Sequence, residues 1–277
     1  MSNSLLGLEG KKILILGGGQ GMGESSAVLL ARAGCDVALA DLELPRAQRV
    51  AERVTGLGRK ARAYAVDVTN DSALEAAIRR ADDDMGGLDG MATIIGMANF
   101  KPLLDMSMDD WELDIRRNVR YFFLAAKTLA GLLIKGSRSG AMVCITSVDG
   151  LQSAPYHAPY GAAKAGLVNL VRSMSEEWAE HGIRINALAP GAIITPRIPE
   201  WGGELEKQRT LRIPMRRRGT TDEIGKGVLF LLSDLASYVT GHTLAVDGGF
   251  TAVGPLDYGE TLRRLPKGGT FGLSEKK

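Results

Sequence analysis

Tyr160 and Lys164 are four residues apart, a spacing that places both side chains on one face of a helix. A phenol, with a reference pKa of about 10, is a poor base at neutral pH. A neighbouring ammonium stabilises the phenolate and lowers that pKa, so that the tyrosine can exchange a proton with a substrate. Ser147 lies 13 residues earlier, at the carboxyl end of an expected strand, where ligands bind in open α/β sheets. The three residues together predict a site for acid–base chemistry.

A glycine-rich segment follows the first expected strand. Gly17, Gly21 and Gly23 have the spacing G-x-x-x-G-x-G and open a helix. Glycines permit a tight turn and the close approach of backbone to a pyrophosphate, and the helix N-terminus offers unpaired N–H groups. The segment therefore predicts a dinucleotide site, to which Gln20 and Met22 also contribute. The alternative is a glycine-rich turn that binds nothing.

Two carboxylates follow the next two expected strands. Asp41 lies 18 residues after Gly23, where an acid can accept hydrogen bonds from both adenosine ribose hydroxyls. Because it would repel a 2′-phosphate, and no Arg or Lys lies within the glycine turn, Asp41 favours NAD over NADP. Its alternative role is a helix-capping aspartate before Pro45. Asp67, followed by Val68, is expected at the adenine edge, and its equal alternative is an N-cap for the next helix.

The rest of the chain must position these residues. Short apolar runs alternate with longer amphipathic segments, which indicates repeated βαβ units, a parallel sheet and helices on both faces. The expected strands are residues 13–16, 37–40, 63–66, 91–95, 142–145, 183–188 and 243–246. The expected helices are residues 23–33, 45–55, 72–85, 108–133, 158–180 and 221–232. We therefore predict one doubly wound α/β domain of the Rossmann type over residues 1–251.

Two segments break this alternation. Residues 196–219 form a connection longer than compact domains usually contain, and we expect a substrate lid there. Residues 252–277 are rich in glycine and proline, and we expect an extension that forms no separate domain.

Composition excludes several classes of function. The 277 residues include 34 Lys and Arg against 32 Asp and Glu, so the net charge of +2 gives no overall field to attract nucleic acid. Two cysteines and three histidines cannot build a disulfide framework or a metal cluster. Residues 1–12 contain no apolar core long enough for a signal peptide, and the longest apolar runs fall far short of about 18 residues, so we expect neither a signal peptide nor a membrane span. We expect a cytoplasmic protein with no metal, nucleic-acid or membrane partner.

In this order along the chain, the motifs resemble the short-chain dehydrogenase/reductase family of NAD(P)-dependent oxidoreductases. The resemblance covers about residues 10–251 and also rests on Asn118, on Pro190 with Gly191, and on residues 246–249. It implies a seven-stranded sheet of order 3-2-1-4-5-6-7 and a homotetramer or homodimer.

The resemblance also implies roles for single residues. Tyr160 is the general acid and base, Lys164 lowers its pKa and holds the nicotinamide ribose, and Ser147 binds the reacting oxygen. Asn118 holds a water that continues the proton relay. The nicotinamide end of the cofactor is expected to contact Gly96, Pro190, Gly191, Ile193 and Thr195.

The sequence departs from the family at two neighbouring segments. Leu16 stands where the family usually has Thr, and residues 93–96 replace its usual Asn-Asn-Ala-Gly. Replacing both partners of a buried hydrogen bond by apolar groups can be nearly neutral. Our hypothesis is that Leu16 packs against the end of the fourth strand.

The substrate side is expected to be mostly apolar, with no cation at its centre, which favours a hydrophobic cyclic or steroid-like secondary alcohol or ketone. Its expected residues are Ala98, Asn99, Phe100, Asp149, Leu151, Gln152, Ser153, Ile198, Trp201 and Leu205, and His157 is expected beside them. An NADPH-dependent 3-oxoacyl thioester reductase is one alternative, and Asp41 argues against it. A non-catalytic nucleotide-sensing protein on the same fold is another.

Overall fold

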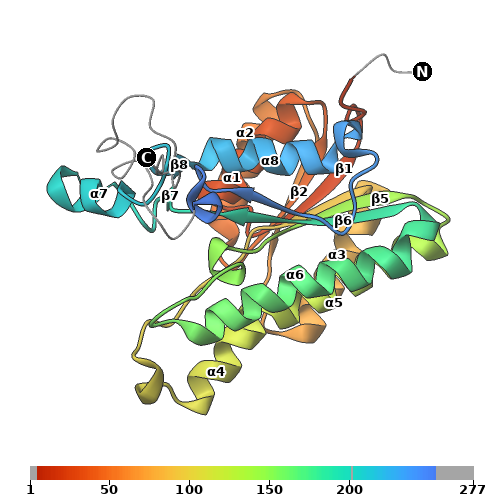
Figure 1. Ribbon diagram of the computed structural model, residues 1–277. Coiled ribbons are helices and arrows are strands. Elements are labelled where there is room, and N and C mark those ends of the chain that lie inside the picture. Colours follow the sequence, from red (N-terminus) through yellow and green to blue (C-terminus); the bar gives the residue numbers. More distant parts are fainter. Residues whose placement is uncertain (1–4, 201, 254–277) are drawn as a thin grey trace, which may run out of the picture.

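The computed structural model describes residues 5–200 and 202–253, which form one domain around a parallel sheet of seven strands (Figure 1). The strand order is β3-β2-β1-β4-β5-β6-β9. This is the predicted order 3-2-1-4-5-6-7, since β7 and β8 belong to another sheet and β9 is the seventh strand of this one. The strands are β1 (Lys12–Leu16), β2 (Asp36–Asp41), β3 (Ala61–Ala65), β4 (Gly90–Thr93), β5 (Gly140–Ile145), β6 (Ile183–Pro190) and β9 (Thr243–Val246).

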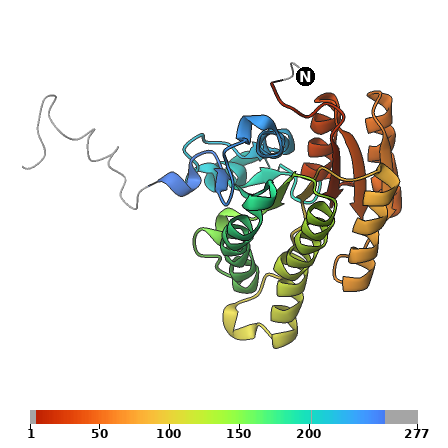
Figure 2. The same cartoon turned by 90° about the vertical axis from the view of Figure 1, so that its right-hand side faces the viewer.

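Helices cover both faces of the sheet, as the alternation of elements predicted. One face carries α1 (Gly21–Arg32), α2 (Leu44–Gly56) and α8 (Thr221–Leu232). The other carries α3 (Asp71–Met85), α5 (Tyr121–Lys135) and α6 (Ala158–Trp178). Figure 2 shows these two layers of helices on either side of the strands.

Strand β1 shows why the central strands are continuously apolar. Leu14 and Leu16 belong to the apolar cluster on the α3–α5–α6 face, whereas Ile13 and Ile15 belong to the cluster on the α1–α2–α8 face. Successive side chains of a strand point to opposite faces, and here both faces are buried. From Ile13 to Leu16, the strand therefore has no position at which a polar side chain would reach water.

The segment predicted as one helix over residues 108–133 is divided in the structure. It consists of α4 (Met108–Ile115), a π-helical turn (Arg116–Arg120) and α5. Asn118 lies in the π turn, and its side-chain Nδ2 donates to the carbonyl oxygen of Asp114 at 2.9 Å. In a regular α-helix that carbonyl would accept the backbone N–H of Asn118, so the side chain competes with the helical hydrogen bond.

The expected lid segment contains structure that the sequence did not reveal. Strands β7 (Ile193–Ile194) and β8 (Gly219–Thr220) pair in a separate small sheet at its two ends, and α7 (Gly203–Thr210) lies between them. Two-residue strands are too short to show a period, and α7 has no apolar stripe that would indicate a helix. Trp201 and residues 254–277, which include nearly all of the expected extension, lie outside the described residues.

Candidate active site

The glycine turn joins the end of β1 to the start of α1. Gly17 has a φ of +80°, and a Cβ on it would lie 2.5 Å from the carbonyl oxygen of Ile94. A Cβ on Gly23 would lie 2.0 Å from the carbonyl oxygen of Gly17. No larger residue fits at either position, so the glycines bring the N-terminus of α1 against the ends of two strands. The free N–H groups of that helix end fit a pyrophosphate.

Asp41 lies at the carboxyl end of β2, beside this turn. Its Oδ2 accepts the N–H of Gly19 at 2.9 Å, and its Oδ1 accepts the N–H of Glu43 at 3.2 Å. Glu43, not Asp41, occupies the N-cap position of α2, so the alternative of a helix-capping Asp41 is wrong. The side chain instead links the glycine turn to the second strand, where an adenosine ribose would lie.

The first turn of α2 brings a cation to the same place, which sequence reasoning missed. A Cβ on Gly19 would lie 2.7 Å from the Cβ of Arg46, and the guanidinium of Arg46 pairs with Glu43 at 2.8 Å. The only signal in the sequence was the position of Arg46 five residues after Asp41. The surroundings of the expected ribose site therefore contain both signs of charge.

Asp67 follows β3 and is held by its own turn. Its Oδ1 accepts the backbone N–H of Thr69 at 2.9 Å and the hydroxyl of Thr69 at 2.7 Å. The N-cap of α3 is Asn70, whose side chain accepts the N–H of Ala73. The alternative of Asp67 as the N-cap is therefore wrong. Asp67 is exposed and available to a ligand at the sheet edge, while its neighbour Val68 packs against the core.

Lys164 is buried beneath the predicted catalytic tyrosine. Its Nζ donates to the carbonyl oxygens of Ile95 at 3.1 Å and Ile145 at 2.9 Å, so the ends of β4 and β5 hold it. The ammonium lies 5.5 Å from the centre of the Tyr160 ring. Burial lowers the pKa of Lys164 to about 8. A cation is thus kept next to the phenol in a site with little water to screen it.

Tyr160 lies on α6 with its phenol in contact with Ser147. Burial raises the pKa of Tyr160 to about 12, and a hydrogen bond between the side chains of Tyr160 and Ser147 opposes that rise. The negative charge of Asp149 raises the pKa of Tyr160 further, whereas the positive charge of Arg197 lowers it. In the protein by itself, burial outweighs the opposing groups, so the phenol is protonated at neutral pH.

Asn118 is fully buried and fastened to the chain that follows β4. Its Nδ2 donates to the carbonyl oxygen of Met97 at 2.8 Å, and its Oδ1 accepts the N–H of Met97 at 3.1 Å. A Cβ on Gly96 would lie 3.1 Å from Nζ of Lys164 and 3.5 Å from Oδ1 of Asn118. Gly96 therefore allows the lysine and the asparagine to approach the same stretch of backbone.

The remaining expected cofactor residues lie where β6 ends. Gly191 donates to the carbonyl oxygen of Val246 at 3.1 Å, so the turn after Pro190 packs against the end of β9. Ile193 is buried in β7. The N–H and C=O groups of Thr195 both pair with Ile198 at 3.1 Å, which closes a tight turn at the start of the lid. The lid begins directly beside the glycine turn, because a Cβ on Gly21 would lie 3.5 Å from Cδ of Pro196.

The two departures from the family pattern are neighbours in the sheet. Leu16 is opposite Thr93 in the register of β1 and β4, and its carbonyl oxygen accepts the N–H of Ile94 at 2.8 Å. Leu16 is fully buried in the same apolar cluster against which Ile95 packs.

Arg197 was also missed. The sequence predicted no cation at the centre of the substrate side, yet Nη2 of Arg197 donates to the carbonyl oxygen of Gly96 at 3.3 Å. Its charge is close enough to lower the pKa of Tyr160. The sequence contained no signal for this, because nothing in a loop sequence shows which of its side chains turns back toward the sheet.

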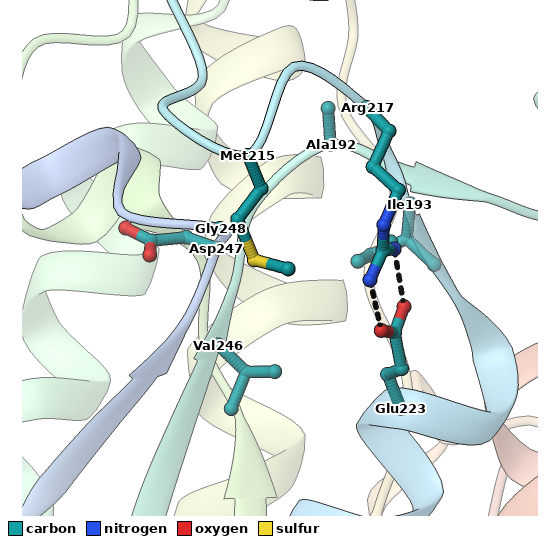
Figure 3. Close-up of a pocket in the computed structure, with 9 residues that line it drawn as sticks. Ala192, Ile193, Met215, Arg217, Glu223, Val246, Asp247 and Gly248 are labelled. Atoms are coloured by element: carbon teal, nitrogen blue, oxygen red, sulfur yellow. Dashed lines mark hydrogen bonds and ion pairs between the residues drawn. The ribbon is translucent and has the colours of Figure 1, made fainter.

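A small cavity of about 90 Å³ lies where β7, β8 and the ends of the lid and of β9 meet (Figure 3). Two hydrogen bonds join Arg217 and Glu223 across one side of it. It is lined by Ala192, Ile193, Met215, Arg217, Gly219, Glu223, Val246, Asp247 and Gly248. Since Ser147, Tyr160 and Lys164 are not in this lining, the cavity is not the predicted acid–base site.

Within residues 5–200 and 202–253, no three His, Cys, Asp or Glu side chains are grouped so that they could bind a metal ion. In the same part of the chain, no helix combines the length and apolar character needed to cross a membrane.

Comparison with known proteins identifies the family. A family model described as enoyl-(acyl carrier protein) reductase matches residues 17–251. The 2-(S)-hydroxypropyl-CoM dehydrogenase 3 of Xanthobacter autotrophicus is 37% identical, over 91% of this chain and 100% of that protein. The 3-oxoacyl-[acyl-carrier-protein] reductase FabG of Chlamydia pneumoniae is 33% identical, over 88% and 98%. A solved 7α-hydroxysteroid dehydrogenase, complexed with NADH and 7-oxo glycochenodeoxycholic acid, has a TM-score of 0.84 at 32% identity, over 90% and 97%.

The chain belongs to the short-chain dehydrogenase/reductase family. It is therefore an oxidoreductase that acts on alcohols or ketones and binds a nicotinamide cofactor. The glycine turn fits that cofactor, because its backbone is bare of side chains where a pyrophosphate would approach the N-terminus of α1.

Proposed function

We propose that the protein is an NAD(H)-dependent oxidoreductase that interconverts a secondary alcohol and a ketone, with a hydrophobic cyclic or steroid-like substrate. One observation carries this proposal: the Tyr160 phenol lies between the Ser147 hydroxyl and the Lys164 ammonium. All three groups are next to the carboxyl ends of β4 and β5, where the sheet binds its ligands.

The residues of this chain handle the proton, while the bound nicotinamide supplies hydride transfer. Oη of Tyr160 gives a proton to the oxygen of a ketone or takes one from the hydroxyl of an alcohol. Oγ of Ser147 holds that oxygen in reach of the phenol. The Lys164 ammonium favours the phenolate and would bind the ribose hydroxyls of the cofactor. Asn118 holds the backbone after β4 and so keeps the lysine's surroundings in place.

The preference for NAD rests on Asp41. Its Oδ2 accepts the N–H of Gly19 and its Oδ1 accepts the N–H of Glu43, so the carboxylate is held beside the glycine turn. A 2′-phosphate placed there would meet an anion at close range, which costs on the order of 1–4 kcal/mol. Arg46 lies close by, but its guanidinium is already paired with Glu43.

The choice of substrate rests on the apolar side chains after β4 and β5 and in the lid. Phe100 is 71% exposed, and Leu151 and Ile198 are nearly half exposed, although all three are large and apolar. Such side chains favour a substrate that buries them. The likeness to a 7α-hydroxysteroid dehydrogenase supports a ring system of this kind.

A second candidate is an NADPH-dependent 3-oxoacyl thioester reductase. Arg46 beside the glycine turn favours it, because this guanidinium could leave Glu43 and bind a 2′-phosphate. The likeness to the 3-oxoacyl-[acyl-carrier-protein] reductase FabG supports the same candidate function.

The experiment follows reduced nicotinamide by its absorbance, with NAD and NADP and a panel of apolar cyclic alcohols, and with NADH and NADPH and 3-oxoacyl thioesters. Tyr160→Phe is the blank for contaminating activity. Turnover of cyclic alcohols with NAD supports the first proposal. If the enzyme reduces 3-oxoacyl thioesters with NADPH and oxidises no cyclic alcohol with NAD, the second proposal replaces the first. NAD binding with no turnover of any substrate would favour a nucleotide-sensing protein.

By the family resemblance, we also propose that the protein is a homotetramer or homodimer. Because its two cysteines, Cys35 and Cys144, cannot form a disulfide framework, we propose that it works in the reducing environment of the cytoplasm. Light scattering of the purified full-length chain measures the assembly, and a monomer at micromolar concentration would contradict it.

A further inference from the structure

Ser147 shares a hydrogen-bond network with two residues that the proton chemistry above does not use. Its Oγ accepts the N–H of Asp149 at 3.1 Å and lies 3.2 Å from Oδ2 of the same residue. That Oδ2 lies 3.1 Å from Nε2 of His157, which precedes Tyr160 by three residues. The network therefore runs from the serine of the site to a histidine at its edge.

The hydroxyl of Ser147 has one proton to donate. An ionised carboxylate only accepts hydrogen bonds, so Ser147 gives this proton to Asp149 in the structure. The carbonyl oxygen of a ketone would need the same proton. Asp149 and the substrate therefore compete for it, and the charge on Asp149 decides how strongly the protein holds it.

His157 faces a hydrogen-bond acceptor at each ring nitrogen. Nδ1 lies 2.7 Å from the carbonyl oxygen of Pro155, and Nε2 faces the carboxylate of Asp149. An imidazole that donates to both acceptors carries two protons and a positive charge. In that state it neutralises Asp149 and weakens the pull of the carboxylate on the Ser147 proton. A neutral imidazole leaves the full negative charge in place.

The surrounding structure holds the imidazole in this position. The His157 side chain is 14% exposed, and its ring centre is 4.7 Å from that of Phe100 and 5.7 Å from that of Tyr160. The preceding residue, Tyr156, has a φ of +67°, a conformation that costs free energy for a bulky side chain. Its carbonyl oxygen accepts the N–H of Lys101 at 2.8 Å. Because the Lys101 hydrogen bond helps to hold Tyr156 in this strained conformation, the backbone before His157 is fixed and so is the position of its imidazole.

We propose that Asp149 and His157 form a positioning pair that controls whether Ser147 gives its proton to the protein or to the substrate oxygen. This inference rests on the proposed function, in which Ser147 holds that oxygen. A doubly protonated His157 lets Asp149 release the serine proton to the ketone oxygen. A neutral His157 leaves Asp149 to retain that proton, and the ketone is then bound and reduced less efficiently.

Other charged groups also surround the site. Asp114 on α4 and Arg197 in the lid act on Tyr160, and Lys164 lies below its ring. They are the same in the wild type and in the variants below, so a comparison between variants isolates the Asp149–His157 pair.

The test measures kcat/KM for ketone reduction by the full-length protein with saturating reduced cofactor, from about pH 5 to 9. Asp149→Ala frees the serine proton from its hydrogen bond to a charged group, so we expect kcat/KM to rise roughly tenfold. His157→Phe keeps the ring contacts but leaves Asp149 uncompensated, so we expect kcat/KM to fall roughly tenfold. The double variant should behave as Asp149→Ala, because His157 acts only through Asp149. His181→Phe, an exposed histidine in the turn after α6, is the matched control.

Opposite effects of the two single variants are the result that a merely structural role would not produce. A fall in both, or a double variant worse than either single one, would overturn the inference. Asp149→Asn, which keeps the side chain's shape, should shift kcat/KM in the same direction as Asp149→Ala and guards against a folding defect. In a Ser147→Ala background, both substitutions should be without effect. A wild type that turns over no alcohol or ketone would instead overturn the proposed function, and this inference with it.

Discussion

The two ends of the site are built in different ways. At the acid–base end, Asn118 and Lys164 are fully buried and Ser147 is nearly so, and backbone groups from other elements hold the lysine and the asparagine. At the adenosine end, the carboxylate of Asp67 is exposed and held by its own turn, and that of Asp41 is partly exposed. Moving a proton requires groups whose positions and pKa values are set by burial, whereas recognising a ribose requires only a carboxylate at the right point of the sheet edge.

The largest expected effect is at the buried end. Tyr160→Phe removes the proton donor, so kcat should fall by at least about 10³-fold, within the range of general acid–base catalysis. Cofactor affinity and the melting temperature should change little, because only one oxygen is removed. Steady-state kinetics measures kcat, cofactor titration measures the affinity, and a thermal melt measures the melting temperature. Tyr238→Phe, at a fully exposed tyrosine, is the matched control. A Tyr160→Phe enzyme with a tenth or more of the wild-type kcat would show that another group moves the proton.

The burial of Lys164 should appear in the pH dependence of stability. Its pKa falls from 10.5 in the unfolded chain to about 8 in the folded one, so the unfolded state binds more protons between these values. Lys164 should therefore add up to about 3 kcal/mol to the free energy of unfolding as the pH rises across this window, whereas the buried thiols of Cys35 and Cys144, whose pKa values burial raises, act in the opposite direction. Urea unfolding of the wild type and of Lys164→Met at both ends of the window isolates the contribution of Lys164.

Lys164→Met should lack that contribution, whereas Lys135→Met, at an exposed lysine of α5, should retain it. The same pH slope in the wild type and in Lys164→Met would mean that the lysine is as well solvated in the folded protein as in the unfolded chain.

At the adenosine end, the expected effect is one of preference. Asp41→Ser removes the anion that faces a 2′-phosphate, so the ratio of kcat/KM for NADP to that for NAD should rise about tenfold or more. The rise should be larger if Arg46 is released to bind the phosphate. Asp83→Ser, at an exposed acid on α3, should leave the ratio unchanged. An unchanged ratio in Asp41→Ser would remove the argument for NAD.

The smallest effect concerns the strand ends that join the two halves of the site. Leu16→Thr exchanges a buried leucine for a smaller, polar side chain, and we expect a loss of about 1–2 kcal/mol in stability. For a chain of this size, that lowers the melting temperature by roughly 2–8 °C. Leu57→Thr, at a partly exposed leucine after α2, is the control in a thermal melt. A melting temperature that stays the same or rises would contradict the paired exchange of Leu16 and residues 93–96.

Much of the fold was predictable from local patterns. Buried parallel strands are apolar on both faces, so each of the seven strands of the large sheet was visible as a short apolar run, and the helices as amphipathic stretches between them. The strand order came from the family resemblance. The two-residue strands β7 and β8 and the polar helix α7 were not predictable, because none of them has a hydrophobic period.

The sequence by itself determined which residue types could hold a cofactor and move a proton. Gly17, Gly23, Tyr160 and Lys164 are recognisable because their chemistry depends on spacing within one turn or one helix. Only the tertiary structure decided that Arg46 lies beside the glycine turn and that Arg197 lies near Tyr160. It alone joined Ser147 to His157 through Asp149. These contacts connect separate elements, and their side chains meet only after the sheet has brought the ends of its strands together.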